Sequence, residues 1–365
     1  MDPALSRRAR RAELLLLAAS LLAVLGLAEI AVRLLGANRP QATGYAPVNT
    51  NRRAMRPHNA RGYRDLERNP DKGAGTRRLL CLGDSFAWGA SVEFEDALPQ
   101  RLERGLTRRR RERWEVVNLA LPGMNTVDQE AQLAQEGFAY HPDVVLLAYV
   151  LNDSEDATAA EARRAADWAE TRRQARPPSL LDHSALLAWV RGRLWATAEN
   201  RRRVSGYLSM YTDDAPGWVA GRRALERMGA LCRAQGVPFV VAIFPLFGNP
   251  LDARYPFERI HARVAEAAGQ AGARVVDLLP AYRGLRWDIL VVDGVDDEHP
   301  NEIAHRIAAN TLLHELDAVI PGEPAATPPP GGLGAQPRRG AMPTRSGVSP
   351  QGFRAGIVSR PEPPE

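Results

Sequence analysis

The stretch LLCLGDSFAWGASV, from Leu79 to Val92, decides how the rest of the chain is interpreted. It runs from an apolar segment directly into Gly83, Asp84 and Ser85, and then into aromatic residues and a second glycine. A strand that only fills a core needs no such ending. A serine that must present its hydroxyl group at the edge of a sheet does need one, so the stretch predicts a buried strand followed by a functional turn.

Further apolar segments follow, and they alternate with segments of helical pattern. The expected strands are Arg78–Leu82, Trp114–Leu119, Asp143–Val150, Val237–Phe244 and Arg274–Leu278. Such runs are typical of strands that are covered on both faces, and therefore of a parallel sheet. The alternation extends over roughly 240 residues, which predicts a doubly wound α/β fold with helices on both faces of the sheet.

One segment interrupts this alternation. Residues 154–215 are rich in Ala and Arg, and we interpret them as a helical insertion that caps the edge of the sheet. The next helix is expected to begin in DDAPGW, Asp213 to Trp218, with an aspartate as its N-terminal cap and Pro216 in its first turn. Gly236 is expected to end it.

The N-terminal residues predict on which side of a membrane the rest of the chain lies. Residues 1–13 contain four arginines and precede a long apolar run. A helix from Leu14 to Leu35 would be roughly 33 Å long, enough to cross the hydrocarbon core of a bilayer. We therefore predict a transmembrane helix at residues 14–36, with the basic tail in the cytoplasm and the rest of the chain on the other side.

Two charged residues near the end of this run, Glu29 and Arg33, are four positions apart and can pair on one helix face. A cleaved signal peptide is the alternative, because it also has a basic start and an apolar core. No small-x-small cleavage site directly follows the run, so a retained anchor is favoured.

The remaining boundaries follow from composition. Residues 37–76 show little periodicity and are interpreted as a linker with a candidate edge strand, and residues 77–318 as the folded domain. Residues 319–365 are rich in Pro and Gly and have no core pattern, so a disordered tail is predicted.

Charge and cysteine content exclude several classes of protein. The formal net charge is +5, but acidic residues are interleaved with arginines and no aromatic residues alternate with the basic ones, so no nucleic-acid partner is expected. Cys81 and Cys232 are expected to be buried thiols rather than a disulfide. No Cys/His spacing suggests a metal site, and no cofactor is expected.

Polar residues follow several of the expected strands. In a parallel sheet the carboxyl ends of the strands meet at one edge, where ligands bind. A hydroxyl (Ser85), a glycine turn (Gly123), an amide (Asn152) and an acid–imidazole pair (Asp296 and His299) are therefore expected to converge.

Acyl transfer needs such a set. A serine hydroxyl is a poor nucleophile near neutral pH, so it requires a general base that a carboxylate orients. We expect Ser85 to be the nucleophile and His299 the base, with Asp296 bonded to the second ring nitrogen. Fixed donors must stabilise the oxyanion. The candidates are the backbone N–H groups of Ser85 and Gly123 and the side-chain amide of Asn152.

These residues resemble those of the SGNH/GDSL hydrolases, here of the bacterial membrane-anchored kind, over about residues 77–318. The four blocks are GDSF at Gly83–Phe86, PGMNT at Pro122–Thr126, LND at Leu151–Asp153 and DDEHPN at Asp296–Asn301. The resemblance implies a flavodoxin-like three-layer sandwich with a mainly parallel five-stranded sheet, and the same roles for the residues named above. Some relatives use an Asp-x-His spacing, which would select Asp297 instead of Asp296 as the acid.

The leading hypothesis is a membrane-anchored serine esterase that acts through an acyl-enzyme intermediate outside the cytoplasm. Its partners would be an ester-bearing substrate, such as an acylated glycan or lipid, and the membrane itself. It would lie in the bacterial inner membrane as a single-pass protein, with the catalytic domain on the periplasmic side. The alternatives are an O-acyltransferase or deacetylase acting on a cell-envelope polysaccharide, and a non-enzymatic envelope protein that keeps the fold.

Overall fold

The structure is a computed structural model that describes residues 3–35, 58–156, 184–293 and 297–320. The predicted tail beyond residue 320, the last residue of the predicted transmembrane helix, residues 37–57 of the predicted linker and residues 157–183 of the predicted insertion lie outside the described residues.

Five parallel strands form the central sheet. They are β1 (Thr76–Gly83), β2 (Arg113–Asn118), β3 (Val144–Tyr149), β4 (Phe239–Ile243) and β5 (Arg274–Asp277), in the order β2-β1-β3-β4-β5. Leu80 of β1, for example, is in register with Val117 of β2 and with Val145 of β3. This order is that of flavodoxin-like sheets, and the predicted α/β fold is confirmed.

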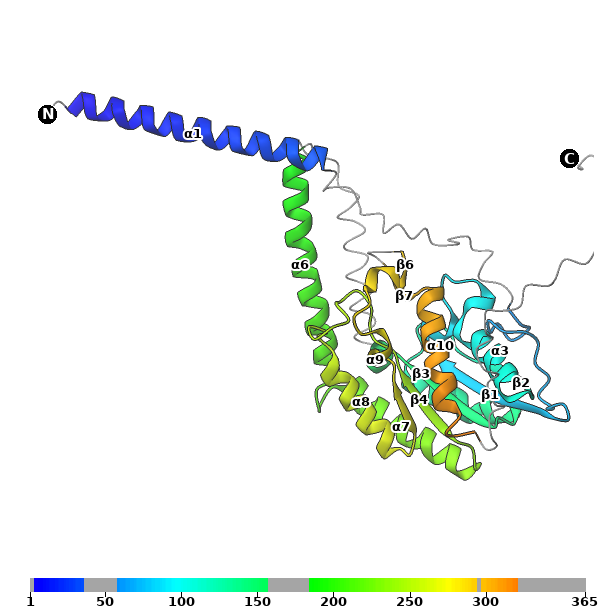
Figure 1. Ribbon diagram of the computed structural model, residues 1–365. Coiled ribbons are helices and arrows are strands. Elements are labelled where there is room, and N and C mark those ends of the chain that lie inside the picture. Colours follow the sequence, from blue (N-terminus) through cyan, green and yellow to red (C-terminus); the bar gives the residue numbers. More distant parts are fainter. Residues whose placement is uncertain (1–2, 36–57, 157–183, 294–296, 321–365) are drawn as a thin grey trace, which may run out of the picture. The chain divides into compact units, whose positions relative to one another are not determined.

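Helices cover both faces of the sheet and make the three layers (Figure 1). On one face, α3 (Leu98–Arg110) packs against α10 (Glu302–Leu316). On the other face, α7 (Pro216–Ala234) packs against both α4 (Thr126–Gln135) and α8 (Glu258–Gln270). The shorter helices are α2 (Ser85–Trp88), η2 (Phe94–Asp96), η3 (Gly137–Tyr140), η4 (Leu151–Ser154), α9 (Leu279–Tyr282) and η6 (Trp287–Ile289).

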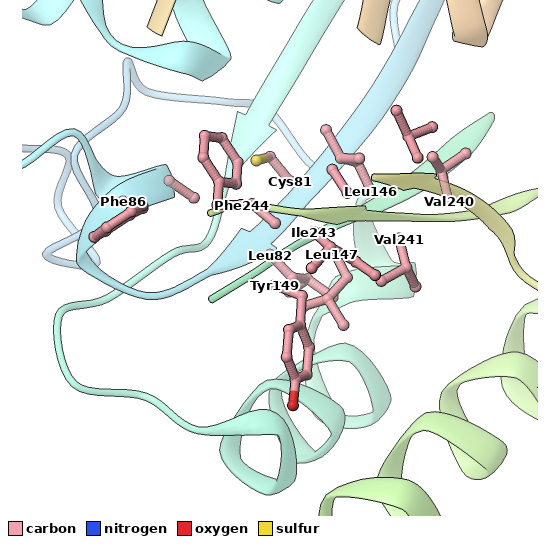
Figure 2. Close-up of a cluster of buried hydrophobic side chains, with 14 of the residues drawn as sticks. Cys81, Leu82, Phe86, Leu146, Leu147, Tyr149, Val240, Val241, Ile243 and Phe244 are labelled. Carbon is pink, nitrogen blue, oxygen red and sulfur yellow. The ribbon is translucent and has the colours of Figure 1, made fainter. Parts of the chain in front are cut away.

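The inner strands are apolar because both of their faces are buried. All six residues of β3 and all five of β4 are buried, and Figure 2 shows side chains of β1, β3 and β4 packed together. The expected thiols are part of this interior, since Cys81 and Cys232 are both free and buried. This core holds the strand ends, and therefore the loops that follow them, in fixed positions.

Residues 63–68, part of the predicted linker, cover the open edge of β2. Tyr63, Arg64 and Asp65 are buried, and no strand is assigned between residues 58 and 75. The Asp65 carboxylate accepts a hydrogen bond from Asn118 N at 3.0 Å, and the Arg68 side chain donates to Val116 O at 3.3 Å. These side chains satisfy backbone groups that an edge strand would otherwise expose.

A small antiparallel hairpin precedes the last helix. It consists of β6 (Val291–Asp293) and β7 (Asp297–Pro300). The Asn301 side chain holds its end in place, because its amide nitrogen donates to Ile289 O at 2.9 Å while its oxygen caps α10. The hairpin was not predicted, since strands this short and polar show no periodic pattern.

The N-terminal helix α1 (Pro3–Leu34) contains a segment, Ala12–Leu34, that is long and apolar enough to cross a membrane, with a mean hydropathy of 2.4. The predicted pair of charges forms, with Arg33 Nε 2.7 Å from Glu29 Oε1. In the described part of the predicted insertion, a long helix, α6 (Ala185–Met210), leads to the first turn of α7.

Candidate active site

Ser85 begins the short helix α2 directly after β1, as the opening stretch predicts. Gly83 allows this turn: its φ is +155°, and a Cβ at this position would lie 2.8 Å from Ala87 Cβ and 3.0 Å from Ala148 O. The Asp84 carboxylate then caps α2 by accepting a hydrogen bond from Phe86 N at 2.9 Å. Ser85 is left half-buried just beyond the carboxyl end of β1.

His299 approaches Ser85 from the far end of the chain. Its Nε2 atom lies 2.8 Å from Ser85 Oγ, although 214 positions separate the two residues. The imidazole ring packs beside Phe86, with 5.6 Å between the ring centroids. The hairpin and the Asn301 cap described above therefore deliver a ring nitrogen to the serine hydroxyl within hydrogen-bond distance.

The structure does not describe the position of the carboxylate that is predicted to orient His299. Asp296 lies outside the described residues, and so does the side chain of Asp297, whose backbone belongs to β7. The choice between Asp296 and Asp297 therefore stays a prediction.

Asn152 joins the site from the carboxyl end of β3, on η4. Its side-chain nitrogen donates a hydrogen bond to Asp84 Oδ2 at 3.0 Å, so the amide lies against the residue that precedes Ser85. Gly123 lies on the turn between β2 and α4, with a φ of +81°. That turn is tied to the same strand end, because Leu121 N donates to Gly83 O at 3.3 Å. The sheet thus brings together the loops that carry the predicted oxyanion donors.

Asp84 is a site residue that the sequence analysis did not single out. It is fully buried, and its two oxygens accept hydrogen bonds from Phe86 N and from the Asn152 amide. Burial raises the pKa of Asp84, while these two hydrogen bonds and the nearby His299 oppose the rise. Its position directly before the serine was the available signal, since Asp is a common helix cap.

Tyr211 is a second such residue, and it comes from the end of α6. Its hydroxyl group donates to Leu151 O at 2.9 Å and lies 2.8 Å from the hydroxyl of Tyr149. Tyr149 in turn bonds Ser154 Oγ at 2.9 Å. All three side chains are buried. They fix both ends of η4, the element that carries Asn152.

Asp153 holds the same element from within. Its carboxyl group accepts hydrogen bonds from Val150 N at 3.1 Å and from the Gln129 amide at 3.2 Å. Burial, together with the neighbouring carboxyl of Asp84, raises the pKa of Asp153 well above its usual range. Two buried carboxyl groups therefore lie behind Asn152, each hydrogen-bonded to a side-chain amide.

Comparison with known proteins identifies the family of the chain. The model of the GDSL-like lipase/acylhydrolase family matches residues 81–307, which is more than half of the chain. No curated protein sequence matches. Among solved structures, TesA is 16% identical, with 67% of this chain and 99% of TesA covered and a TM-score of 0.41.

Two further solved structures have similar identity, coverage and TM-score. A catalytic mutant of Axe2, an acetylxylan esterase from Geobacillus stearothermophilus, is 16% identical, with 66% and 94% of the two chains covered and a TM-score of 0.41. An α/β hydrolase from the metagenome of Lake Arreo is 18% identical, with 67% and 96% covered and a TM-score of 0.41. On the match to the family model, this chain belongs to the GDSL-like lipase/acylhydrolase family and is a serine hydrolase that acts on ester bonds.

Proposed function

We propose that this protein cleaves its ester substrate through an acyl-enzyme intermediate, with Ser85 as the nucleophile and His299 as the general base. Ser85 Oγ attacks the acyl carbon as His299 Nε2 takes its proton. When the tetrahedral intermediate collapses, the ester C–O bond breaks and the imidazolium gives the proton to the leaving alcohol. Water then attacks the acyl-serine in the same way, which releases the carboxylic acid and frees Ser85.

The donors for the oxyanion are proposed to be the backbone N–H groups of Ser85 and Gly123 and the amide of Asn152. An amide nitrogen carries two hydrogens. Asp84 accepts one of them, so the other is left to donate to the oxyanion that forms on the substrate's carbonyl oxygen. Each such donor typically contributes about 3 kcal/mol of transition-state stabilisation.

The contact between His299 Nε2 and Ser85 Oγ carries this proposal. A protein that kept the fold only to bind a partner would have no use for an imidazole at that place. The buried hydrogen bonds around Asp84 and η4 support it further, because they hold the amide of Asn152 beside the same serine.

Steady-state kinetics on short acyl esters test the proposal. Ser85→Ala and His299→Ala should each lower kcat by at least about 10³-fold, because members of a nucleophile–base pair act as a unit. Ser205→Ala and His314→Ala are matched controls, since both residues are exposed on helices α6 and α10, and they should retain parental turnover. Full activity in Ser85→Ala would refute the assignment.

For the acid we propose Asp296, on the Asp-x-x-His spacing, with Asp297 as the alternative. The role is to hold the imidazole in the tautomer that leaves Nε2 free to accept the serine proton. Asp296→Asn should then lower kcat by about 10²- to 10⁴-fold, and Asp297→Asn by much less. The reverse ranking would assign the role to Asp297.

We further propose that α1 is a retained, single-pass anchor in the bacterial inner membrane, with the hydrolase domain on the periplasmic side. Its length, its hydropathy and its basic N-terminal flank support this orientation. Intact-mass measurement on protein extracted from membranes should find residues 1–36 still attached. A mature chain that starts beyond the apolar segment would identify a signal peptide instead.

An acyl acceptor other than water would make the same site a transferase for an envelope polysaccharide. A membrane anchor would keep such a substrate close, which is the observation in favour. Incubation with an acetyl donor and a glycan distinguishes the two: we expect free acetate, and acetylated glycan would show transfer.

A further inference from the structure

Glu29 lies inside the apolar segment of α1 and has partners from a distant part of the chain. Its carboxylate accepts hydrogen bonds from Ser184 Oγ, Ala185 N and Leu186 N, each at 2.8 Å. Ser184 is the N-cap of α6, and its hydroxyl oxygen also accepts a hydrogen bond from Leu187 N at 3.1 Å. Glu29 and Ser184 together satisfy backbone donors that the first turn of a helix leaves unpaired.

The covered side of α1 is narrow and specific. Between residues 12 and 35, only Ala28, Glu29 and Val32 are buried or half-buried. Their spacing places them on one face of the helix. The first turn of α6 contacts this face, and Ala185 is buried.

The position of Glu29 along α1 sets the depth of this contact. At 1.5 Å per residue, Glu29 lies about 7 to 8 Å before Leu34, the end of the apolar segment. The whole segment is about 35 Å long and the hydrocarbon core about 30 Å thick, so Glu29 would lie just inside the outer boundary of the core. A carboxylate at that depth requires partners in place of water, and the N-terminus of α6 supplies them.

The sequence at the start of α6 is suited to a position near the outer boundary of the hydrocarbon core. Its first six residues, Ala185–Val190, read ALLAWV and are all apolar, and they include Trp189. Two arginines, Arg191 and Arg193, follow in the sequence. Tryptophan is enriched at the level of the lipid head groups. The rest of α6 contains the polar run ENRRRVS, residues 199–205.

We propose that Glu29 and the first turn of α6 form a docking element that holds residues 184–190 in the outer interface of the bilayer that α1 spans. The partner is the lipid surface itself. The proposal rests on the anchoring role given to α1 above. It has a structural consequence for the site, because the opposite end of α6 leads into Tyr211, which bonds the η4 element.

Quenching of tryptophan fluorescence by brominated lipids tests the proposal on the full chain in lipid nanodiscs. The contribution of Trp189 is the difference between the parent and Trp189→Phe. We expect that contribution to fall at least two-fold in lipids brominated close to the head group, compared with unbrominated lipids. An anchored chain whose Trp189 emission is the same in both lipids would overturn the proposal.

Variants of Glu29 test the docking contact separately. Glu29→Leu should abolish the quenching of Trp189, Glu29→Gln should retain part of it through the remaining amide oxygen, and Glu13→Leu, at the other end of the apolar segment, should retain all of it. Unchanged quenching in Glu29→Leu would contradict the role of Glu29. Far-UV circular dichroism of each variant reports that its domain is folded.

Failure of the anchoring role is distinguishable from failure of this inference. A protein recovered without residues 1–36 would overturn both. An intact chain that stays in the membrane, but whose Trp189 is not quenched, would overturn the docking element alone.

Discussion

Asp84 determines how the amide of Asn152 is oriented. The amide nitrogen donates to Asp84 Oδ2, and a carboxylate can only accept at this place. The nitrogen of Asn152 is therefore held on the side of Asp84, the residue before Ser85, as its proposed role as an oxyanion donor requires. A neutral amide at position 84 would present a donor of its own.

We predict that Asp84→Asn makes the side-chain amide of Asn152 rotate, so that its oxygen and nitrogen exchange places. The new amide can still cap α2 through its oxygen, but its nitrogen then faces Asn152 and favours the carbonyl oxygen of that side chain. An oxygen in place of a donor should lower kcat by about 10²- to 10³-fold, the usual effect of losing one oxyanion donor, with little change in KM.

A double-mutant cycle separates this orienting role from a general loss of structure. In an Asn152→Ala background there is no amide to turn over, so Asp84→Asn should lower kcat by only a few-fold more. Independent, multiplicative effects of the two substitutions would contradict the orienting role.

His305 illustrates a buried titratable group that the reaction does not use. It is fully buried on α10, with neither ring nitrogen hydrogen-bonded within the described residues. Burial, together with the positive charges of Arg101 and Arg64 and the neighbouring His299, lowers the pKa of His305 from 6.5 to about 3. The neutral ring is the form that the folded domain accepts.

The stability of the domain should therefore depend on pH through His305. Between pH 6.5 and 3 the unfolded chain binds the proton and the folded chain does not, so the free energy of unfolding falls as pH decreases. At pH 5 the effect is about 2 kcal/mol for one histidine. Urea unfolding at pH 7 and pH 5 should show a smaller decrease in His305→Gln than in the parent, with the exposed His314→Gln as the control. Equal decreases in all three proteins would contradict the prediction.

At the scale of the elements, η4 is held by hydrogen bonds from elsewhere in the chain. Tyr211 and Tyr149 hold its two ends, and Thr126 Oγ1 donates to Asp153 O at 3.2 Å. These bonds are buried, so each lost partner leaves a polar group unsatisfied. The position of Asn152 should therefore depend on the end of α6.

Tyr211→Phe removes one hydroxyl and keeps the ring. We expect kcat to fall by roughly 3- to 30-fold with KM almost unchanged, because a displaced donor weakens the transition state more than substrate binding. Tyr63→Phe is the matched control: its hydroxyl also bonds a side chain, that of Gln132 at 3.1 Å, but on α4 rather than η4. A similar loss of stability in both variants, with kcat lowered in Tyr211→Phe alone, would support the positioning role. Equal kcat values in both would count against it.

The strands and helices were largely predictable from the sequence, whereas details at their ends were not. Each expected strand of the sheet is present, because an apolar run bounded by turn residues is a strong signal. The predicted cap of α7 is wrong: the N-cap is Ala215 and makes no side-chain bond, while Asp213 pairs with Arg263. Asp213 lies two positions before this N-cap, and its partner on α8 is not visible in DDAPGW.

On the scale of the whole molecule, the order of the strands explains the place of the site. β1 and β3 are neighbours although β2 lies between them in sequence, so the chain turns to opposite sides after them. Ligand sites of open α/β sheets lie at this reversal, outside the carboxyl ends of the strands. The convergence of Ser85, Asn152 and His299 was therefore predictable from the strand pattern and the resemblance.

The hydrogen bonds between residues far apart in the sequence could not be predicted in the same way. The bond from Asn152 to Asp84 spans 68 positions, and the bond from Ser184 to Glu29 spans 155. A single sequence carries no local pattern for partners so far apart. The pairing of Glu29 with Arg33 could be foreseen because it lies within one helix, whereas the capping of α6 by the same carboxylate could not.

Covalent labelling tests directly whether a single hydroxyl group in the whole molecule, that of Ser85, is the nucleophile. The full chain is treated with a fluorophosphonate, digested, and mapped by mass spectrometry. The account predicts a single adduct on Ser85 and a labelling rate that falls by at least about 10³-fold in His299→Ala. An adduct on a different residue, or labelling of Ser85 at an unchanged rate without the imidazole of His299, would contradict it.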